Sequence, residues 1–354
     1  MKDIVIKAGD CKDFIGKVLK IFKIPEDIAS RWAELLTETS LLGFDSHGIR
    51  MLERYINHIE GGGIEPAAKP EIIVENQQCV TMDAKGGLGH ISADVATSIA
   101  IEKAKKGGIS CVAVKNANHV GACGLYVRTA AMKDCIGIFT TVSRAAMAPW
   151  GGMIPFLGSN PIAIGAPIME KPPFLFDAAS SVVSMGKITA AKDNNMEIPD
   201  SWALDRHGKP TTNPAEAIKG SLLPMAGHKG YGLAMAVEIL SAFLSGSLPS
   251  FQVESWLQQT EKPSNASFTI IVIDIAALGD ADIFKKHMKV WVDLLTGSDV
   301  REGFKKIYYP GQIEEDNYAY RLKNGIPLGM CDYEMFERVA DKFNITKPVI
   351  AKSL

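Results

Sequence analysis

Residues 109–143, ISCVAVKNANHVGACGLYVRTAAMKDCIGIFTTVS, alternate between strand and helix patterns. The segments ISCVAVKN (109–116) and IGIFTTVS (136–143) are short apolar runs rich in β-branched residues, which is typical of buried strands. Between them, GLYVRTAAMKDC (124–135) has the pattern of a helix. Because alternating strands and helices are typical of a sheet covered by helices, the stretch predicts an α/β layer with a largely buried sheet.

The same alternation continues on both sides of this stretch. We expect further strands at 70–76, 78–85 and 267–278, with the first two paired, and the stretches at 160–168 and 173–180 are also apolar. Helices are predicted between 25 and 59, at 230–246 and at 282–295. A further helix is predicted to have Ser92 as its N-cap and to end at 107–108. The turn-rich segment 198–214 is interpreted as a surface excursion.

The composition is that of an ordinary soluble globular protein rather than a nucleic-acid or membrane protein. The 354 residues are enough for two or three packed units. The net charge is −2 and the sequence has no basic stripe, so we do not expect nucleic acid as a partner. No apolar run reaches the roughly 18 residues of a membrane span, and the first residues lack a signal-peptide core, so we expect a cytoplasmic protein. The six scattered cysteines are expected to be small buried side chains and to bind no metal.

The usual phosphate-binding signatures are missing from the chain. Neither GxGxxG nor GxxxxGK[ST] occurs, which disfavours an ordinary Rossmann domain. The segment AGHKGYGL (226–233) could still bind phosphates through the amides at a helix start, with Lys229 nearby, or it could simply turn the chain. A Schiff-base role for Lys229, in a pyridoxal-phosphate enzyme, is the alternative from a different class.

Two of the seven histidines lie among small and polar neighbours, His47 in DSHG and His119 in NANHVGACG. His119 follows a predicted strand, where open α/β sheets place their ligand crevice. An imidazole there could exchange a proton near neutral pH, although a structural role is equally open for both. The other histidines are interpreted as surface or packing residues, apart from His228, which adjoins Lys229.

A basic and aromatic cluster follows His47. Ser46 and His47 are not a serine-hydrolase pair, because no GxSxG elbow is present. Arg50 and Arg54 are four residues apart and share a helical face. Since a guanidinium group suits a carboxylate, these arginines with Tyr55 are candidates for binding a small carboxylic acid, or else they are solvated surface residues.

Six motifs, in order, resemble the type-2 malate/L-lactate dehydrogenase family, whose members include sulfolactate, ureidoglycolate and diketogulonate oxidoreductases. The motifs are DSHGIRMLERYINHIEGGGI (45–64), NANHVGACG (116–124), PWGGMIPFLGSNPIAIGAP (149–167), FDAASSVVSMGKI (176–188), IPDSWALDRHGKPTTNP (198–214) and LLPMAGHKGYGLAMAVEIL (222–240). The resemblance implies a homodimeric NAD(P)-dependent enzyme with a non-Rossmann mixed sheet flanked by helices. The implied units are a helical domain at 1–72, a cofactor-binding α/β domain at 73–284, and a C-terminal helical part at 285–354 that returns to the first.

The resemblance also implies roles for individual residues. His47 or His119 is the proton donor or acceptor, Ser46 assists, and Asp177 lies near the cofactor or acts with the serine and histidine. Cofactor contacts are implied for Ser143, Phe176, Asp177, Ala178, Ala179, Ser180, Ser181, Val182, His228, Lys229, Gly311, Gln312 and Ile313. Many relatives carry an arginine where this chain has Met51, so the carboxylate clamp could be Arg50, Arg54 or another residue.

The resemblance leaves the substrate open among 2-hydroxy and 2-keto acids. We expect malate and oxaloacetate, with NAD or NADP, and the alternatives are the lactate, sulfolactate, ureidoglycolate and diketo-sugar-acid reactions. A non-catalytic binding relative is a further alternative. We hypothesise that Arg144, a position where relatives vary, binds the second carboxylate of a dicarboxylic acid; Ser143 beside it is a further substrate-binding candidate.

Overall fold

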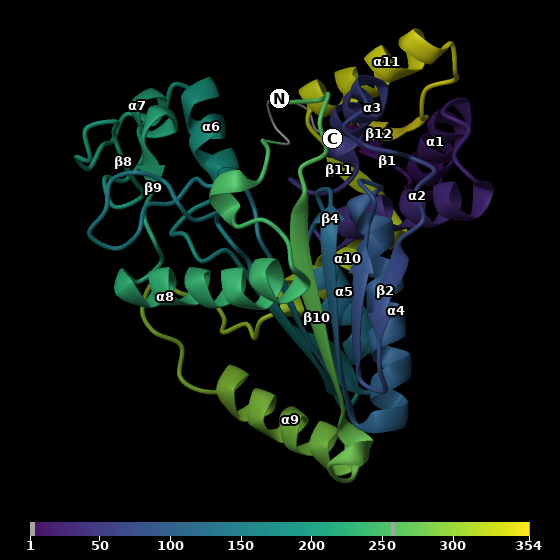
Figure 1. Ribbon diagram of the computed structural model, residues 1–354, viewed down its shortest axis with the longest axis vertical. Helices are drawn as coiled ribbons and strands as arrows, with labels where there is room; N and C mark the ends of the chain where they lie inside the picture. The colour runs from purple at the N-terminus through teal and green to yellow at the C-terminus, as the bar shows by residue number, and fades with distance from the viewer. Residues whose placement is uncertain (1–3, 256–258, 354) are drawn as a thin grey trace.

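A seven-stranded mixed sheet forms the centre of the molecule in the computed structural model, which describes residues 4–255 and 259–353 (Figure 1). The strand order is β2-β3-β4-β10-β5-β6-β7. The strands are β2 (Glu71–Glu75), β3 (Cys79–Asp83), β4 (Ile109–Ala117), β5 (Cys135–Thr141), β6 (Ile162–Ile168), β7 (Lys171–Ala178) and β10 (Ala266–Asp274). Five of them overlap the strands expected from the sequence, and β6 and β7 overlap the two apolar stretches at 160–168 and 173–180. The mixed α/β fold is confirmed.

Only one neighbouring pair of strands in this sheet, β3 with β4, is parallel. The other pairs are antiparallel. Helix α4 (Gly89–Gly107) connects β3 to β4. Parallel neighbours need such a crossover, so this βαβ unit accounts for the single parallel pairing.

Helices cover both faces of the sheet. On one face lie α4 and α5 (Gly124–Ala131), and the contact face of α4 is lined with small side chains. These are Ala93, Ala96, Ala100 and Ala104, all fully buried. Their spacing of three and four residues puts them on one helical stripe, which lets the helix approach the strands closely. The helix α8 (His228–Val237) continues into the π-helical turn η2 (Glu238–Phe243), which packs on β10.

The two chain ends fold together at one end of the sheet (Figure 1). The short strand β1 (Ile4–Ile6) pairs with β11 (Ile326–Leu328) and β12 (Ile350–Ser353). Four helices pack around them: α1 (Ala8–Ile21), α2 (Glu26–Leu41), α3 (Leu52–Gly61) and α11 (Met330–Phe343). This unit therefore contains a small sheet that the sequence did not indicate. The domain boundaries remain a prediction, and the one at 284/285 falls inside α9 (Ala281–Thr296).

A small lobe projects from the other side of the sheet (Figure 1). It contains α6 (Met185–Asp193), β8 (Ala203–Leu204), α7 (Pro214–Lys219) and β9 (Ser221–Leu222). The prediction of a surface excursion at 198–214 is wrong in part, because Ile198 and Ala203 are buried with Leu222 in a separate apolar core. The remaining elements are η1 (Ile49–Met51), η3 (Ser250–Gln252), η4 (Ile275–Ala277) and α10 (Gln312–Asn324).

Three further local predictions need correction. Helix α4 begins at Gly89, and the Ser92 hydroxyl donates to the Gly89 carbonyl inside the helix instead of capping it. The predicted helix 230–246 is interrupted by the π-helical turn. Cys79 and Cys331 are exposed, so not all of the cysteines are buried, although all six are free thiols. Within the described ranges, no helix combines the length and apolarity that crossing a membrane requires.

Candidate active site

The loop that carries Ser46 and His47 is fixed between α2 and α10. Asp45 accepts two hydrogen bonds from Arg321 of α10, at 2.5 and 3.1 Å. The amide of Ile49 donates to the Ser40 hydroxyl at the end of α2. Within the loop, the Ser46 Oγ lies 2.8 Å from the Nδ1 of His47. The loop is thus held from both sides, and Ser46 is placed to orient the imidazole.

His119 faces His47 across a short gap. It follows β4, and the preceding residue, Asn118, is buried and donates to the Gly86 carbonyl. The two imidazole rings lie nearly parallel, 5.5 Å between centroids and 22° between planes. The Tyr55 hydroxyl, from α3, lies 2.7 Å from the Nδ1 of His119. The structure therefore brings Ser46, His47, Tyr55 and His119 into one cluster.

Both imidazoles favour the neutral form. Burial lowers the pKa of His47 below its usual 6.5. Burial also holds the pKa of His119 well below 6.5, and the charges of neighbouring side chains add to the effect. These neighbours are His47, His90, Arg54 and His58. A neutral imidazole can accept a proton at neutral pH, so either ring is suited to act as a base.

The two candidate arginines have different surroundings. The Nε of Arg50 lies 3.1 Å from the Oδ2 of Asp332 in α11, an ion pair that ties η1 to the C-terminal helix. Arg54 acts on the histidine cluster, because its charge contributes to the lowered pKa of His119 and works against the burial that raises the pKa of Tyr55. Of the two, Arg54 is the better placed to attract a carboxylate to this cluster.

Asp177 joins this cluster to the central sheet. It lies near the end of β7, and its Oδ2 accepts a hydrogen bond from the Gly124 amide at the start of α5, at 2.7 Å. A methyl group added at Gly124 would lie within 3.3 Å of both Phe44 and Asp177, so the loop that leads to His47 passes close by. Burial raises the pKa of Asp177 to about 6, against the lowering effect of the Gly124 amide. This carboxyl can therefore hold or release a proton near neutral pH.

A second cluster gathers the segments expected to contact a cofactor. The Ser143 hydroxyl lies 3.3 Å from that of Ser159, and the Ser180 hydroxyl donates to the Ser159 carbonyl. The Met225 amide, just before α8, donates to the Ser180 carbonyl. His228 and Lys229 are exposed in the first turn of α8, and among the described residues no side chain caps that helix. Its first amides are therefore oriented to bind an anion.

The segment that contains Phe176 to Val182 connects the two clusters. Phe176, Ala178 and Ala179 are partly buried where β7 ends, and Val182 is exposed. Ser181 is buried, with its hydroxyl donating to the Val183 carbonyl. Gly311, Gln312 and Ile313 lie beside the same strand, because the Leu175 amide of β7 donates to the Pro310 carbonyl. Residues implied to contact the cofactor are thus placed along one strand and the start of α8.

Arg144 lines a cavity. Its guanidinium donates to the Ser255 hydroxyl at 3.2 Å. The cavity holds about 400 Å³ and is also lined by Phe251, Gln252, Val253, Glu254 and Gln259. Its role in binding a second carboxylate stays a prediction. No set of three or more potential metal ligands is present in the part of the chain that the structure describes.

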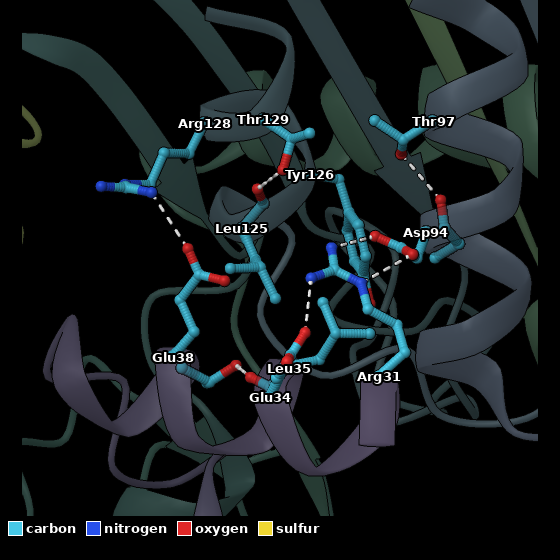
Figure 2. Close-up of polar contacts among 12 residues, drawn as sticks. Arg31, Glu34, Leu35, Glu38, Asp94, Thr97, Leu125, Tyr126, Arg128 and Thr129 are labelled. Atoms are coloured by element: carbon cyan, nitrogen blue, oxygen red, sulfur yellow. Dashed lines mark hydrogen bonds and ion pairs between the residues drawn. The ribbon is translucent and has the colours of Figure 1, made fainter. Parts of the chain in front are cut away.

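Partly buried ion pairs hold the helices α2, α4 and α5 together (Figure 2). Arg128 of α5 pairs with Glu38 of α2 at 3.0 Å and with Glu315 of α10 at 2.5 Å. Arg31 of α2 makes a two-pronged contact with Asp94 of α4. These ion pairs therefore join α2 and α10 to the helices α4 and α5 on the sheet.

Sequence reasoning missed several residues that build this site. Phe44, Asn118, Gly124 and Arg321 were not singled out, and His90 was interpreted only as a surface or packing residue. His90 is buried against both Tyr55 and His119. Its position directly after GGLG (86–89) is the one signal that could have drawn attention to it.

Comparison with known proteins identifies the class of enzyme. A model of the malate/L-lactate dehydrogenase family matches residues 6–334. The chain belongs to this family and is an oxidoreductase that acts on 2-hydroxy acids.

Three relatives illustrate the range of the family. L-sulfolactate dehydrogenase of Methanocaldococcus jannaschii is 36% identical over 342 residues, which cover 97% of this chain and 98% of the relative. Ureidoglycolate dehydrogenase (NAD(+)) of Escherichia coli K12 is 33% identical over 302 residues, 85% of each chain. The crystal structure of malate dehydrogenase from Entamoeba histolytica superposes with a TM-score of 0.93 at 32% identity, covering 98% of this chain and 100% of that one.

Proposed function

We propose that this protein interconverts a 2-hydroxy acid and a 2-keto acid with a nicotinamide cofactor, and that the His47–His119 pair handles the proton. The observation that carries the proposal is the geometry of this pair, with rings 5.5 Å apart and Tyr55 bonded to His119. One imidazole accepts the hydroxyl proton of the 2-hydroxy acid during oxidation and returns it during reduction. Such acid–base help contributes roughly 10²- to 10⁴-fold to the rate.

The neighbouring residues would orient this proton transfer. Tyr55 fixes the ring of His119 through Nδ1, and Ser46 does the same for His47. Arg54 attracts the substrate carboxylate toward the pair. Asp177, with its pKa raised to about 6, can donate or accept a proton near the end of β7. These assignments make the histidines the reacting groups and the other residues their supports.

The residues of the second cluster fit a dinucleotide. The uncapped start of α8, with His228 and Lys229, is suited to the two phosphates, and Ser143 and the end of β7 lie between it and the histidines. A bound nicotinamide supplies or accepts the hydride. Among the relatives, the ureidoglycolate dehydrogenase is named for NAD(+), which favours NAD over NADP here. The family assignment favours this reading over a pyridoxal-phosphate enzyme or a non-catalytic relative.

Malate and oxaloacetate are the proposed substrate pair. Malate and sulfolactate, which name two of the relatives, both carry a second anionic group beyond the 2-hydroxy carboxylate. Arg144 beside its cavity is the proposed partner for that second group. The lactate, ureidoglycolate and diketo-sugar-acid reactions are the alternatives.

A cofactor and substrate screen tests this proposal. The purified protein is mixed with NADH or NADPH and with oxaloacetate, pyruvate, sulfopyruvate or a diketo sugar acid, and absorbance is followed at the nicotinamide band. We expect oxaloacetate with NADH to give the highest kcat/KM. No oxidation of either nucleotide with any of these acids would contradict the proposal, and a higher kcat/KM for another acid would overturn the substrate assignment.

We also propose a cytoplasmic homodimer. Large apolar side chains are more than half exposed on two helical elements: Ile239 and Phe243 on η2, and Val290, Trp291 and Leu294 on α9. Exposed apolar surface of this kind is typical of association sites. Light scattering should give twice the monomer mass, and Phe243→Ser should shift the protein toward monomer. A monomeric wild-type protein at micromolar concentration would contradict the dimer.

A further inference from the structure

His90 occupies the space behind the catalytic histidines. It is the second residue of α4, and its side chain is 1% exposed. Its ring meets the ring of Tyr55 edge-on at 5.3 Å between centroids and that of His119 at 6.3 Å. Trp32 also packs on both His90 and Tyr55. His90 therefore contacts both partners of the Tyr55–His119 hydrogen bond.

Two glycines make room for this imidazole. A Cβ at Gly89 would lie 2.3 Å from the carbonyl oxygens of Asn118 and His119, so the start of α4 can approach the His119 segment only with glycine there. A Cβ at Gly121 would lie 2.4 Å from the Nε2 of His90, and Gly121 also has a φ of +76°. The backbone around the site is thus shaped to admit the His90 ring at this point.

The hydrogen bonding of His90 defines its tautomer. The Trp32 Nε1–H donates to the Nδ1 of His90 at 3.3 Å. Because Nδ1 accepts, the proton of the neutral ring is on Nε2. That nitrogen is buried and has no hydrogen-bond partner within residues 4–255 and 259–353. Burial lowers the pKa of His90 to about 3, with a smaller contribution from His47, so the ring is neutral at physiological pH.

The unpartnered nitrogen argues against a packing role alone. A buried polar group without a partner destabilises the folded state, and a phenylalanine at this position would avoid that. Buried polar groups without a hydrogen-bond partner are rare in folded proteins, and they are expected mainly at functional sites. Here the Nε2 of His90 belongs to a ring that packs on Tyr55 and His119, at the site proposed to transfer a proton.

We propose that His90 is a positioning residue of the active site. Its neutral imidazole fixes the positions of the Tyr55 and His119 side chains relative to each other and keeps water from the buried side of the His119 ring. The inference rests on the proposed role of His119 and deepens it. The titratable groups that face His119 are His47 on the loop after α2, Tyr55, Arg54 and His58 on α3, and His90 on α4. Of these, His90 closes the buried side of the cluster.

Two substitutions separate the functions of this ring. His90→Asn keeps an acceptor near the Nδ1 position for Trp32 but removes the ring from Tyr55 and His119. His90→Phe keeps a ring of similar size and removes the polar nitrogens. His287→Asn makes the same chemical change at an exposed histidine of α9, which is not among the groups that face His119, and serves as the control.

The first readout is the titration of His119 by NMR in the cofactor-free protein, which does not depend on turnover. With His90→Asn, water reaches the ring and we expect the pKa of His119 to rise toward 6.5, whereas His90→Phe and His287→Asn should leave it near the wild-type value. An unchanged titration in His90→Asn would overturn the proposal. If His90→Asn does not fold, a raised pKa of His119 in the folded His90→Phe protein would overturn it equally, because that ring still excludes water.

The second readout is the steady-state rate with a 2-keto acid. We expect His90→Asn to lower kcat about tenfold with little change in the KM for NADH, and His90→Phe to lower kcat less. Equal rates for wild type and His90→Asn would contradict the positioning role. If the wild-type protein turned over no 2-keto acid, the proposed function would fail, while the NMR result would still decide whether His90 shields His119.

Discussion

The hydroxyl oxygen of Tyr55 and the Nδ1 of His119 lie 2.7 Å apart, although the two residues are 64 positions apart in the chain. Tyr55 comes from α3 of the chain-end unit, and His119 follows β4 of the central sheet. A hydrogen bond at Nδ1 fixes which nitrogen of the ring can exchange a proton with the substrate. The imidazole of His119, one of the two proposed to exchange the proton, is thus oriented by a side chain from the other structural unit.

Removing this hydroxyl should slow turnover without unfolding the protein. Because one hydrogen bond contributes about 0.5–1.5 kcal/mol, we expect Tyr55→Phe to lower kcat by up to about tenfold. Steady-state kinetics with a 2-keto acid measure this. Tyr333→Phe, which removes a hydroxyl from a tyrosine buried in α11, is the matched control and should retain wild-type kcat. Equal rates for Tyr55→Phe and wild type would rule out the orienting role.

Alanine substitutions separate the two histidines. Loss of the true acid–base residue should reduce kcat by roughly 10²- to 10⁴-fold, with cofactor binding nearly intact, while loss of the other should have a smaller effect. Cofactor affinity can be followed by NADH fluorescence. If neither His47→Ala nor His119→Ala slows turnover tenfold, the assignment is wrong.

The pH dependence should reflect the lowered pKa values of these histidines. A base must be neutral to accept a proton, and burial moves its pKa below 6.5. The kcat/KM for oxidation of the 2-hydroxy acid should therefore rise with pH through an acid-side pKa below 6.5 and level off by neutral pH. An acid-side pKa of 7 or above, measured with substrate well below KM, would contradict this expectation.

Asp177 should make stability depend on pH in a direction opposite to an ordinary carboxylate. Its pKa is about 6 in the folded chain and 3.8 without the fold, so the folded state binds the proton more tightly and loses stability as pH rises from 4 to 7. Asparagine does not ionise. Relative to wild type, the free energy of unfolding of Asp177→Asn should rise by on the order of 1 to 3 kcal/mol over this range. Urea unfolding at both pH values checks this, and a difference that stays constant would refute the burial argument.

Arg144 provides a test of substrate choice. If it binds the second carboxylate, Arg144→Ala should raise the KM for malate about tenfold or more and leave the KM for lactate nearly unchanged, because a hydrogen bond to a charged group contributes about 1.5–3 kcal/mol. Arg301→Ala, at an exposed site, is the control. Equal effects on the two substrates would remove Arg144 from the substrate site.

The fold was predictable where the pattern of apolar residues is local. The runs that became β4, β5 and β10 are apolar and β-branched, and their segments were identified from the sequence. The order was not predictable, because β10 inserts between β4 and β5 from more than 120 residues away. Strand pairing at such separations depends on tertiary packing rather than on local propensity.

The candidate site was predictable in part for the same reason. His47 and His119 stood out because small and polar residues surround them, and the structure places their rings together. His90 follows a glycine-rich turn and then enters a helix, so its sequence context is that of an ordinary helix start. Only the approach of α4 to the His119 segment turns it toward the site.

A crystal structure of the complex with NADH and an unreactive 2-keto acid analogue tests the central claim most directly. We expect the oxygen on the 2-carbon to lie within hydrogen-bond reach of an imidazole nitrogen of His47 or His119, about 2.6 to 3.2 Å. The nicotinamide C4 should lie about 3 to 3.5 Å from the carbon that is reduced. A nicotinamide ring bound away from both histidines, or a substrate oxygen beyond the reach of either, would contradict the account.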